Sequence, residues 1–252
     1  MNLLVSDFDG TLHTSESQIK INIKRIEDFI KNGNIFMLSS GRSYNSLISK
    51  VRYYDIPYNY LATEDGSHMF DNDGNVVYED NMNKSIVEDI KIIESLNKHK
   101  KIQYGTTYEY YNDDIGLPIS SINFVIDEQE INDALKENWQ ILKNKYKNKY
   151  EFLVYGYAKE YYFCIKDKGI DKKRPVEELS KILNLNNEQI FTIGDGDNDM
   201  PMIMHYNGYM IGNNESLKKV ALKCYNEVYE LIDDIEKQKV KRRWINICLL
   251  MR

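Results

Sequence analysis

Two aspartates, Asp7 and Asp9, stand one residue apart in the stretch LLVSDFDGTL, at the end of an apolar run. Side chains alternate along an extended chain, so the two carboxylates could face the same pocket. Carboxylates that lie so close raise each other's pKa unless a positive charge lies between them. The pair therefore predicts a site that binds a cation. Mg²⁺, which takes a few carboxylates together with a substrate phosphate, suits such a site.

Two further polar clusters follow apolar runs elsewhere in the chain. Ser39 and Ser40 begin the stretch SSGRS, and several acidic residues occupy GDGDND at 194–199. In an open parallel sheet, ligands bind outside the carboxyl ends of the strands, so the three clusters are expected to share one crevice. A third carboxylate from GDGDND would complete the oxygen-rich site for Mg²⁺.

Calcium loops and solvated turns are the alternatives for such acidic runs. An EF-hand loop needs Gly at its sixth position and Glu at its twelfth. Counting from Asp7, these positions hold Leu12 and Gln18, and the count from Asp195 fails in the same way. A solvated turn suits the run DNDG at 71–74 better than the other two runs, because each of those directly follows an apolar strand signal.

Strand and helix signals alternate around these clusters, which predicts a parallel sheet covered by helices. Ile19, Ile23, Ile26 and Ile30, for example, fall on one face of a helix. The expected elements are strands at 2–6, 35–38, 60–62, from 189 and at 208–212, and helices at 15–33, 47–51 and 172–183.

Between residues 83 and 167 the pattern changes. A helix signal is followed by β-like runs on either side of a second amphipathic helix, in which Leu135, Trp139 and Leu142 align. A block of α plus antiparallel β inside an α/β chain indicates an inserted second domain. We expect a discontinuous core at 1–82 and 168–252, with the insert at 83–167.

The composition of the 252-residue chain argues against several function classes. A formal net charge of −6 is unlike a nucleic-acid-binding surface, where a broad basic face is expected. No apolar run approaches the ~20 residues of a membrane span, and the first strand signal begins too close to Met1 for a signal peptide. The three cysteines, Cys164, Cys224 and Cys248, form no CxxC pair, which indicates reduced thiols. We therefore expect a cytoplasmic protein.

The last sixteen residues, KQKVKRRWINICLLMR, are basic first and then apolar. A terminal helix packed on the core or a poorly ordered tail is the ordinary interpretation. A helix lying on a membrane surface is the alternative, which needs a clear apolar face.

Four motifs stand in order along the chain: DFDGT after the first strand, SGR after the second, a lysine in GIDKKRP and GDGDNDMPM after a later strand. In these motifs the chain resembles the haloacid dehalogenase superfamily phosphatases. The insert between the second and third of these motifs resembles the Cof-type branch of the family, and the resemblance extends to about Glu236. It implies an α/β fold with a Rossmann-like parallel-sheet core and an inserted α+β cap domain.

The resemblance also implies roles for the acidic residues. Asp7 matches the nucleophile that forms an aspartyl-phosphate, and Asp9 matches the general acid and base. Asp195 matches a carboxylate that binds Mg²⁺ together with Asp7 and the backbone carbonyl of Asp9. Asn198 and Asp199 match residues that complete or orient this metal site.

The remaining implied roles concern the substrate phosphate. Ser40 aligns with the hydroxyl that binds the phosphoryl group, and Gly41 would let backbone N–H groups approach it. Lys172 aligns with the lysine that neutralises phosphate and nucleophile, although the adjacent Lys173 stays an alternative. Arg42 could bind a second anionic group of the substrate or form a structural salt bridge.

The chain departs from the family pattern after its third strand. The family usually has Asn-Gly there, whereas this chain has Asp65-Gly66 in EDGSH. The added negative charge would favour substrates that bear hydroxyls or an amine. His68, two residues on, is expected to be a surface or hairpin residue rather than a catalyst. The family's Asp-Gly near the C-terminus is replaced here by YNEVYEL at 225–231.

Together these features predict a Mg²⁺-dependent phosphatase that acts on a small phosphomonoester, such as a sugar phosphate, through an aspartyl-phosphate. A phosphomutase of the same fold and a non-catalytic phosphometabolite-binding protein are the alternatives. The expected partner is a small phosphorylated metabolite, with no nucleic acid and no membrane span. The chain is expected to be a monomer or a weak homo-oligomer.

Overall fold

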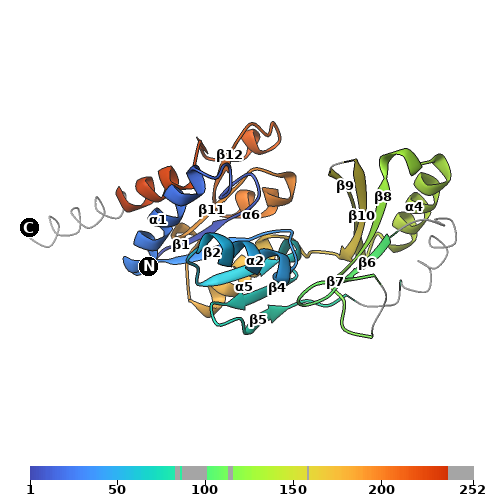
Figure 1. Cartoon of the computed structure of the whole chain (residues 1–252), viewed down its shortest axis with the longest axis horizontal. Coiled ribbons are helices and arrows are strands. Elements are labelled where there is room, and N and C mark those ends of the chain that lie inside the picture. Colours follow the sequence, from blue (N-terminus) through green and yellow to red (C-terminus); the bar gives the residue numbers. More distant parts are fainter. Residues whose placement is uncertain (83–85, 87–100, 113–115, 158, 238–252) are drawn as a thin grey trace, which may run out of the picture.

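The computed structural model describes residues 1–82, 86, 101–112, 116–157 and 159–237. It contains an eight-stranded sheet and a separate five-stranded sheet (Figure 1). The first has a parallel core, as the strand and helix alternation predicts, and the second is antiparallel. The predicted fold class, an α/β core with an additional α+β unit, is therefore confirmed.

The eight-stranded sheet has the strand order β13-β12-β11-β1-β2-β3-β4-β5. Its strands are β1 (Leu3–Ser6), β2 (Ile35–Ser39), β3 (Tyr60–Thr63), β4 (His68–Asp71), β5 (Val76–Glu79), β11 (Ile190–Gly194), β12 (Asn207–Ile211) and β13 (Cys224–Tyr225). Strands β13 to β3 pair in parallel, whereas β4 and β5 add an antiparallel hairpin at one edge. The chain runs outward from β1 in both directions, so β1 lies at the switch point where a doubly wound sheet binds its ligands.

Helices cover both faces of this sheet because its central strands are apolar on both sides. They are α1 (Gln18–Lys31), α2 (Tyr44–Tyr54), α5 (Lys173–Ile182), α6 (Met200–His205) and a helical segment at 228–237, with short 3-10 turns at Glu64–Gly66, Asn187–Gln189, Asp197–Asp199 and Leu217–Lys219. In β1, Leu4 packs in the cluster of α1, α2 and 228–237, whereas Leu3 and Val5 pack in that of α5 and α6.

The antiparallel sheet has the order β7-β6-β8-β10-β9 and a helix on one face. Its elements are β6 (Lys101–Gly105), β7 (Tyr110–Tyr111), β8 (Ser121–Asp127), a 3-10 turn (Glu128–Glu130), α4 (Asp133–Tyr146), β9 (Tyr150–Tyr157) and β10 (Glu160–Asp167). Leu135, Trp139 and Leu142 of α4 pack on the sheet, as their spacing predicts. This helix lies on the side of the sheet that faces away from the eight-stranded sheet (Figure 1).

We call residues 101–167 the antiparallel part and residues 1–79 and 168–237 the core part. The two parts touch at defined points. The backbone N–H of Asn45 donates to the carbonyl of Tyr108 over 2.9 Å, and the ring of Tyr108 contacts those of Tyr44 and Phe70. The hydroxyl of Ser120 also donates to the carboxyl group of Glu64. The boundaries 83 and 167 of the expected insert stay a prediction.

Several details differ from the expectations or lie beyond them. The edge strand β13 was not expected, and His68 lies in the hairpin but is fully buried rather than on the surface. The helix signal after residue 83 and the tail beyond residue 237 lie outside the described residues. Within the described residues, no helix is long and apolar enough to cross a membrane.

Candidate active site

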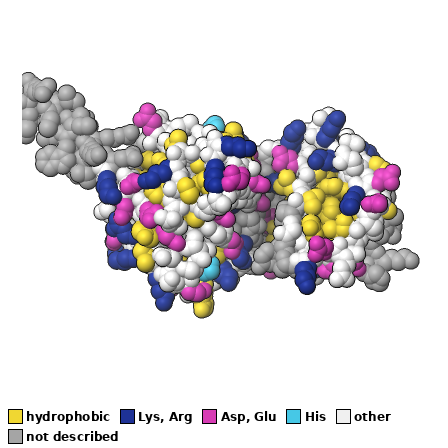
Figure 2. All heavy atoms as spheres, turned by 90° about the horizontal axis from the view of Figure 1, so that it is seen from above, with side chains coloured by type: hydrophobic (Ala, Val, Ile, Leu, Met, Phe, Trp, Pro, Cys, Tyr) yellow, Lys and Arg dark blue, Asp and Glu magenta, His cyan; other side chains and the backbone are white. Residues whose placement is uncertain are grey.

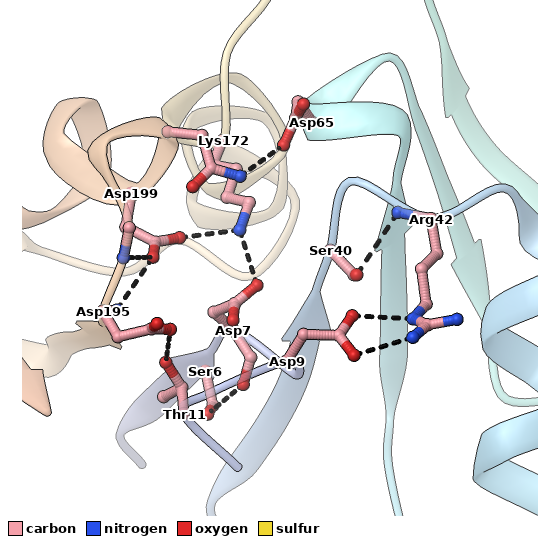
Figure 3. A network of polar contacts seen from close by, with 12 residues as sticks. Ser6, Asp7, Asp9, Thr11, Ser40, Arg42, Asp65, Lys172, Asp195 and Asp199 are labelled. Atoms are coloured by element: carbon pink, nitrogen blue, oxygen red, sulfur yellow. Dashed lines mark hydrogen bonds and ion pairs between the residues drawn. The ribbon is translucent and has the colours of Figure 1, made fainter. Parts of the chain in front are cut away.

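The three polar clusters of the sequence meet at the carboxyl ends of the parallel strands. Asp7 directly follows β1, Ser40 follows β2, and Asp195 follows β11. The backbone N–H of Asp7 donates to the carbonyl of Ile193 over 3.0 Å, which continues the pairing of β1 with β11. Figure 3 shows the side chains that converge there.

Lys172 supplies a buried positive charge to this cluster. Its Nζ donates to Oδ1 of Asp7 over 2.6 Å and to Oδ1 of Asp199 over 2.7 Å, and the side chain is 0% exposed. Burial alone would lower the pKa of Lys172, but the carboxylates of Asp199 and Asp7 outweigh it and raise the pKa above the usual value. Lys172 therefore stays protonated.

Lys173 points elsewhere, although it is adjacent in the chain. Its Nζ lies 3.0 Å from a carboxylate oxygen of Glu177, one turn along α5, and the side chain is 31% exposed. Lys172 precedes the first turn of α5 and faces the strand ends. The structure thus brings Lys172, and not Lys173, to the cluster.

Asp199 holds the acidic loop in place. Its Oδ2 accepts from the backbone N–H groups of Asp195 and Gly196 over 3.0 and 2.9 Å, while its Oδ1 accepts from Lys172. A Cβ at Gly194 would lie 2.3 Å from the Asp199 carboxyl carbon, so only glycine leaves room for this arrangement. Asp199 therefore orients both the loop and the lysine.

The carboxylates of Asp7, Asp195 and Asp199 can all place an oxygen within 4.8 Å of one another. Burial raises the pKa of Asp7 well above its ordinary value and outweighs the lowering by Lys172; burial also raises the pKa of Asp195. Three carboxylates face a single ammonium group here. The excess negative charge and the oxygen donors fit Mg²⁺, which prefers such ligands. We call these three carboxylates and Lys172 the acidic site.

Thr11 and Gly10 support the acidic site from the loop after β1. The hydroxyl of Thr11 donates to Oδ1 of Asp195 over 2.6 Å and lowers the pKa of that carboxyl against the burial effect. Gly10 has a φ of +84°, and a Cβ there would lie 2.4 Å from Asp195 Oδ2. Sequence reasoning missed Thr11, although the threonine of DFDGT was the available signal.

Asp9 points away from the acidic site, toward Arg42 (Figure 3). The guanidinium donates from Nε and Nη2 to the two carboxylate oxygens of Asp9, each over 2.7 Å. The side chains of Asp9 and Arg42 are 52% and 32% exposed. Of the two roles considered for Arg42, the salt bridge is the one present in this structure. Asp199, and not the Asp9 carboxylate, is the third acidic side chain near Asp7 and Asp195.

The residues expected near the phosphate, Ser40 and Gly41, lie directly after β2, beside Asp65 at the end of β3. Ser40 is buried, and its Oγ accepts from the N–H of Arg42 over 3.3 Å. A Cβ at Gly41 would lie 3.1 Å from Asp65 Oδ1, and that oxygen accepts from the amide of Asn198 over 2.9 Å. Asn198 therefore contacts Asp65, the residue that departs from the family pattern.

Three comparisons with known proteins bear on this site. A family model described as haloacid dehalogenase-like hydrolase matches residues 4–230. The search of curated proteins found no match.

Several solved structures are similar to the whole chain. A haloacid dehalogenase-like hydrolase from Bacteroides thetaiotaomicron has a TM-score of 0.75 and 20% identity, covering 93% of this chain and 99% of that chain. A Plasmodium vivax protein described as a HAD/COF-like hydrolase has a TM-score of 0.74 and 19% identity, covering 94% and 96%. The HAD subclass IIB sugar phosphatase BT4131 has a TM-score of 0.70 and 17% identity, covering 94% and 99%. These likenesses show a common fold.

Proposed function

The chain belongs to the haloacid dehalogenase-like hydrolases, and from this premise we propose that it is a Mg²⁺-dependent phosphatase. Its substrate would be a small phosphomonoester, a sugar phosphate or a similar metabolite. One observation carries the proposal: three carboxylates gather around one buried ammonium group at the switch point of the sheet. The sugar phosphatase BT4131, which has the same fold, supports the substrate class.

Asp7 and Asp195, with the backbone carbonyl of Asp9, are the proposed ligands of Mg²⁺. When bound, the ion would neutralise these carboxylates and the charge of the substrate phosphate. Asp199 and Lys172 would keep the loop and the nucleophile oriented, since Lys172 holds Oδ1 of Asp7.

In the first step, a carboxylate oxygen of Asp7 attacks phosphorus and forms the aspartyl-phosphate as the bond to the leaving oxygen breaks. The leaving oxygen takes a proton from Asp9. Lys172 and the hydroxyl of Ser40 bind the phosphoryl oxygens, whose charge must be stabilised during transfer. In the second step, Asp9 removes a proton from water, which attacks phosphorus and releases inorganic phosphate and free Asp7.

The acid role of Asp9 requires a rearrangement of its ion pair. Both of its oxygens accept from Arg42 in this structure, so neither is directed at a leaving group beside Asp7. We propose that substrate binding separates this half-exposed pair. The antiparallel part is the proposed cap, which would close over the substrate and exclude water.

Phosphate release from p-nitrophenyl phosphate and a panel of sugar phosphates, with Mg²⁺ or with chelator, tests this function. Asp7→Asn should lower turnover by about a thousandfold or more, as removal of a nucleophile does. Asp73→Asn, in the exposed turn of the hairpin, is the matched control and should keep full activity. Turnover that survives Asp7→Asn, or does not depend on Mg²⁺, would contradict the proposal.

The same assay separates the alternatives. A phosphomutase would need a bisphosphate activator and release little phosphate, and a binding protein would release none. The remaining expectations are also proposals: one small phosphorylated metabolite as partner, a monomer or weak homo-oligomer, and a cytoplasmic location. Sedimentation of the purified chain and fractionation of cells test the last two.

A further inference from the structure

The antiparallel sheet turns a polar face toward the core part. Its other face carries Ile122, Phe124 and Ile165, which pack with α4. Because side chains alternate along a strand, the residues between these project to the opposite side. The space-filling view shows the molecule hollowed between its two parts (Figure 2).

One row of this polar face reaches the core part. Lys166 of β10 pairs with Ser121 of β8, which pairs with Gly105 of β6, so all three project on one side. A Cβ at Gly105 would lie 2.4 Å from Ser121 Oγ and 2.5 Å from Oε2 of Glu64. The row, which we call the Lys166 row, therefore faces Glu64.

Glu64 connects the Lys166 row to the residues expected around the phosphate. Its Oε2 accepts from the hydroxyls of Ser120 and, over 3.4 Å, Ser121. Its backbone N–H donates to the carbonyl of Arg42 over 2.9 Å, and the next residue, Asp65, donates to the carbonyl of Ser40 over 3.1 Å. The Lys166 row is thus one residue removed from the groups expected around the phosphate.

Lys166 supplies the positive charge of this row. It is 5% exposed, and within the described part of the chain its ammonium group forms no hydrogen bond or ion pair. The acidic side chains on this side are Glu64 and Glu151, which lies opposite Lys166 on β9. The ammonium group therefore keeps contact with solvent at the edge of a largely buried side chain, where an anionic group of a ligand could take the place of water. The nearby Glu64 does not supply this anion at neutral pH, because burial raises its pKa to about 8.

Two further polar atoms on this side have no partner. Oε1 of Glu64 and Oδ1 of Asn123 are buried and accept no hydrogen bond within the described part of the chain. Asn123 lies two residues from Ser121 on β8, hence on the same face. With Glu64 protonated and its Oε2 accepting from the serines, Oε1 can donate to a hydroxyl oxygen of a ligand, and Oδ1 of Asn123 can accept from a hydroxyl group.

We propose that the Lys166 row and Glu64 form a subsite for the leaving group, and that it selects phosphomonoesters whose hydroxylated carbon chain carries a second anionic group. This inference rests on the proposed phosphatase function. Lys166 binds the second anion, a carboxylate or a further phosphate, while Glu64 donates to one hydroxyl and Asn123 accepts from another.

Two matched substrate pairs test the subsite: gluconate 6-phosphate against glucose 6-phosphate, and glycerate 3-phosphate against glycerol 3-phosphate. The first of each pair carries the additional carboxylate. The native chain should show a kcat/KM at least tenfold higher for the carboxylates. Lys166→Met should lower kcat/KM for the carboxylates by about thirtyfold or more, since losing a buried charge partner has effects of this order, and for the neutral members by less than about threefold.

Controls separate the charge from the fold. Lys168→Met, at an exposed lysine two residues on, should leave the preference unchanged, and Lys166→Arg should retain most of it. Turnover of p-nitrophenyl phosphate by each variant reports on the acidic site. A native chain without preference, or equal losses for both members of a pair, would overturn the subsite while leaving the phosphatase function intact.

Failure of the phosphatase function has a different signature. If no phosphomonoester is hydrolysed by the native chain, calorimetry of the same four compounds decides the subsite. Tighter binding of the carboxylates that Lys166→Met abolishes would support it, and equal binding within each pair would overturn it.

Discussion

Two buried lysines, six residues apart in the chain, differ in whether carboxylates pair with them. Lys172 lies among the carboxylates of the acidic site, and the local charge is negative. Lys166 is also largely buried, at 5% exposure, but its ammonium group forms no ion pair in the described residues, although Glu151 lies opposite it on β9. The same residue type thus stabilises an acidic site that fits a cation in one case and, in our proposal, attracts an anion in the other. The neighbouring carboxylates therefore determine whether a buried lysine supports a cation site or binds an anion.

The largest effect on this comparison is expected from Lys172→Met. Removing the ammonium leaves Asp7 and Asp199 buried without their partner, and breaking a buried pair costs ~3–5 kcal/mol of the free energy of unfolding. Urea denaturation in chelator measures this loss, and phosphate release should fall to background. Lys173→Met is the control and should cost less than about 1 kcal/mol, because that lysine is in a partly exposed pair. Equal losses of stability for both variants would contradict the conclusion that Lys172, and not Lys173, pairs with the buried carboxylates.

Mg²⁺ should stabilise the acidic site next most strongly. A ligand that binds only the folded chain adds ~2.7 kcal/mol at a hundred times its dissociation constant. Thermal unfolding with increasing Mg²⁺ should therefore show a rising midpoint, and Asp195→Asn should abolish the rise. Asp197→Asn, whose carboxylate accepts from Asn214 outside the cluster, should preserve it. A midpoint indifferent to Mg²⁺ in the native chain would argue against the metal site.

Glu64 should make the Lys166 side of the molecule sensitive to alkaline pH. Its pKa is raised from 4.5 to about 8, so the folded chain retains a proton that the unfolded chain loses. This contribution to stability is complete below pH 4.5 and is lost as pH rises through about 8, with a slope approaching ~1.4 kcal/mol per pH unit.

Glu64→Gln tests whether Glu64 causes the fall in stability with pH, because the amide does not titrate in this range. The free energy of unfolding should fall from pH 7 to 8 in the native chain and stay flatter in the variant. In this range His68 is mostly neutral in the unfolded chain, and burial, which lowers its pKa from 6.5 to about 4, keeps it neutral in the folded chain. Glu215→Gln, at an exposed carboxylate, should keep the native slope. A native slope in Glu64→Gln would remove Glu64 as its cause.

The smallest effect is expected at Arg42. Its bidentate pair with Asp9 is partly exposed, and exposed pairs contribute ~0–1 kcal/mol. Arg42→Met should therefore change the free energy of unfolding by less than about 1 kcal/mol in urea, in contrast to Lys172→Met. A loss as large as that of Lys172→Met would show that exposure is a poor guide to these pairs.

The sequence predicted the acidic site far better than it predicted the Lys166 row. Asp7, Ser40 and Asp195 each follow an apolar strand, and the rule for parallel sheets brings such positions together. The choice between Lys172 and Lys173 needed the direction of each side chain at the start of α5, which spacing does not supply.

The contacts of Glu64 depend on packing between segments far apart in the chain. Ser120 and Ser121 reach it only because two sheets meet, and no local pattern encodes that meeting. The pairing of Asp9 with Arg42 is similar, since it joins the loops after two different strands. The short strand β13 was missed because two residues give no periodicity.

The acidic site has a consequence for how such enzymes diversify. Every side chain in it comes from the core part, whereas Lys166 comes from the antiparallel part. In our proposal, mutations that accumulate on β6, β8 and β10 would therefore change which molecules are accepted without altering the groups that would break the ester. On that proposal, the reaction and the substrate range would vary separately within one gene, and a designer could exchange one part while keeping the other.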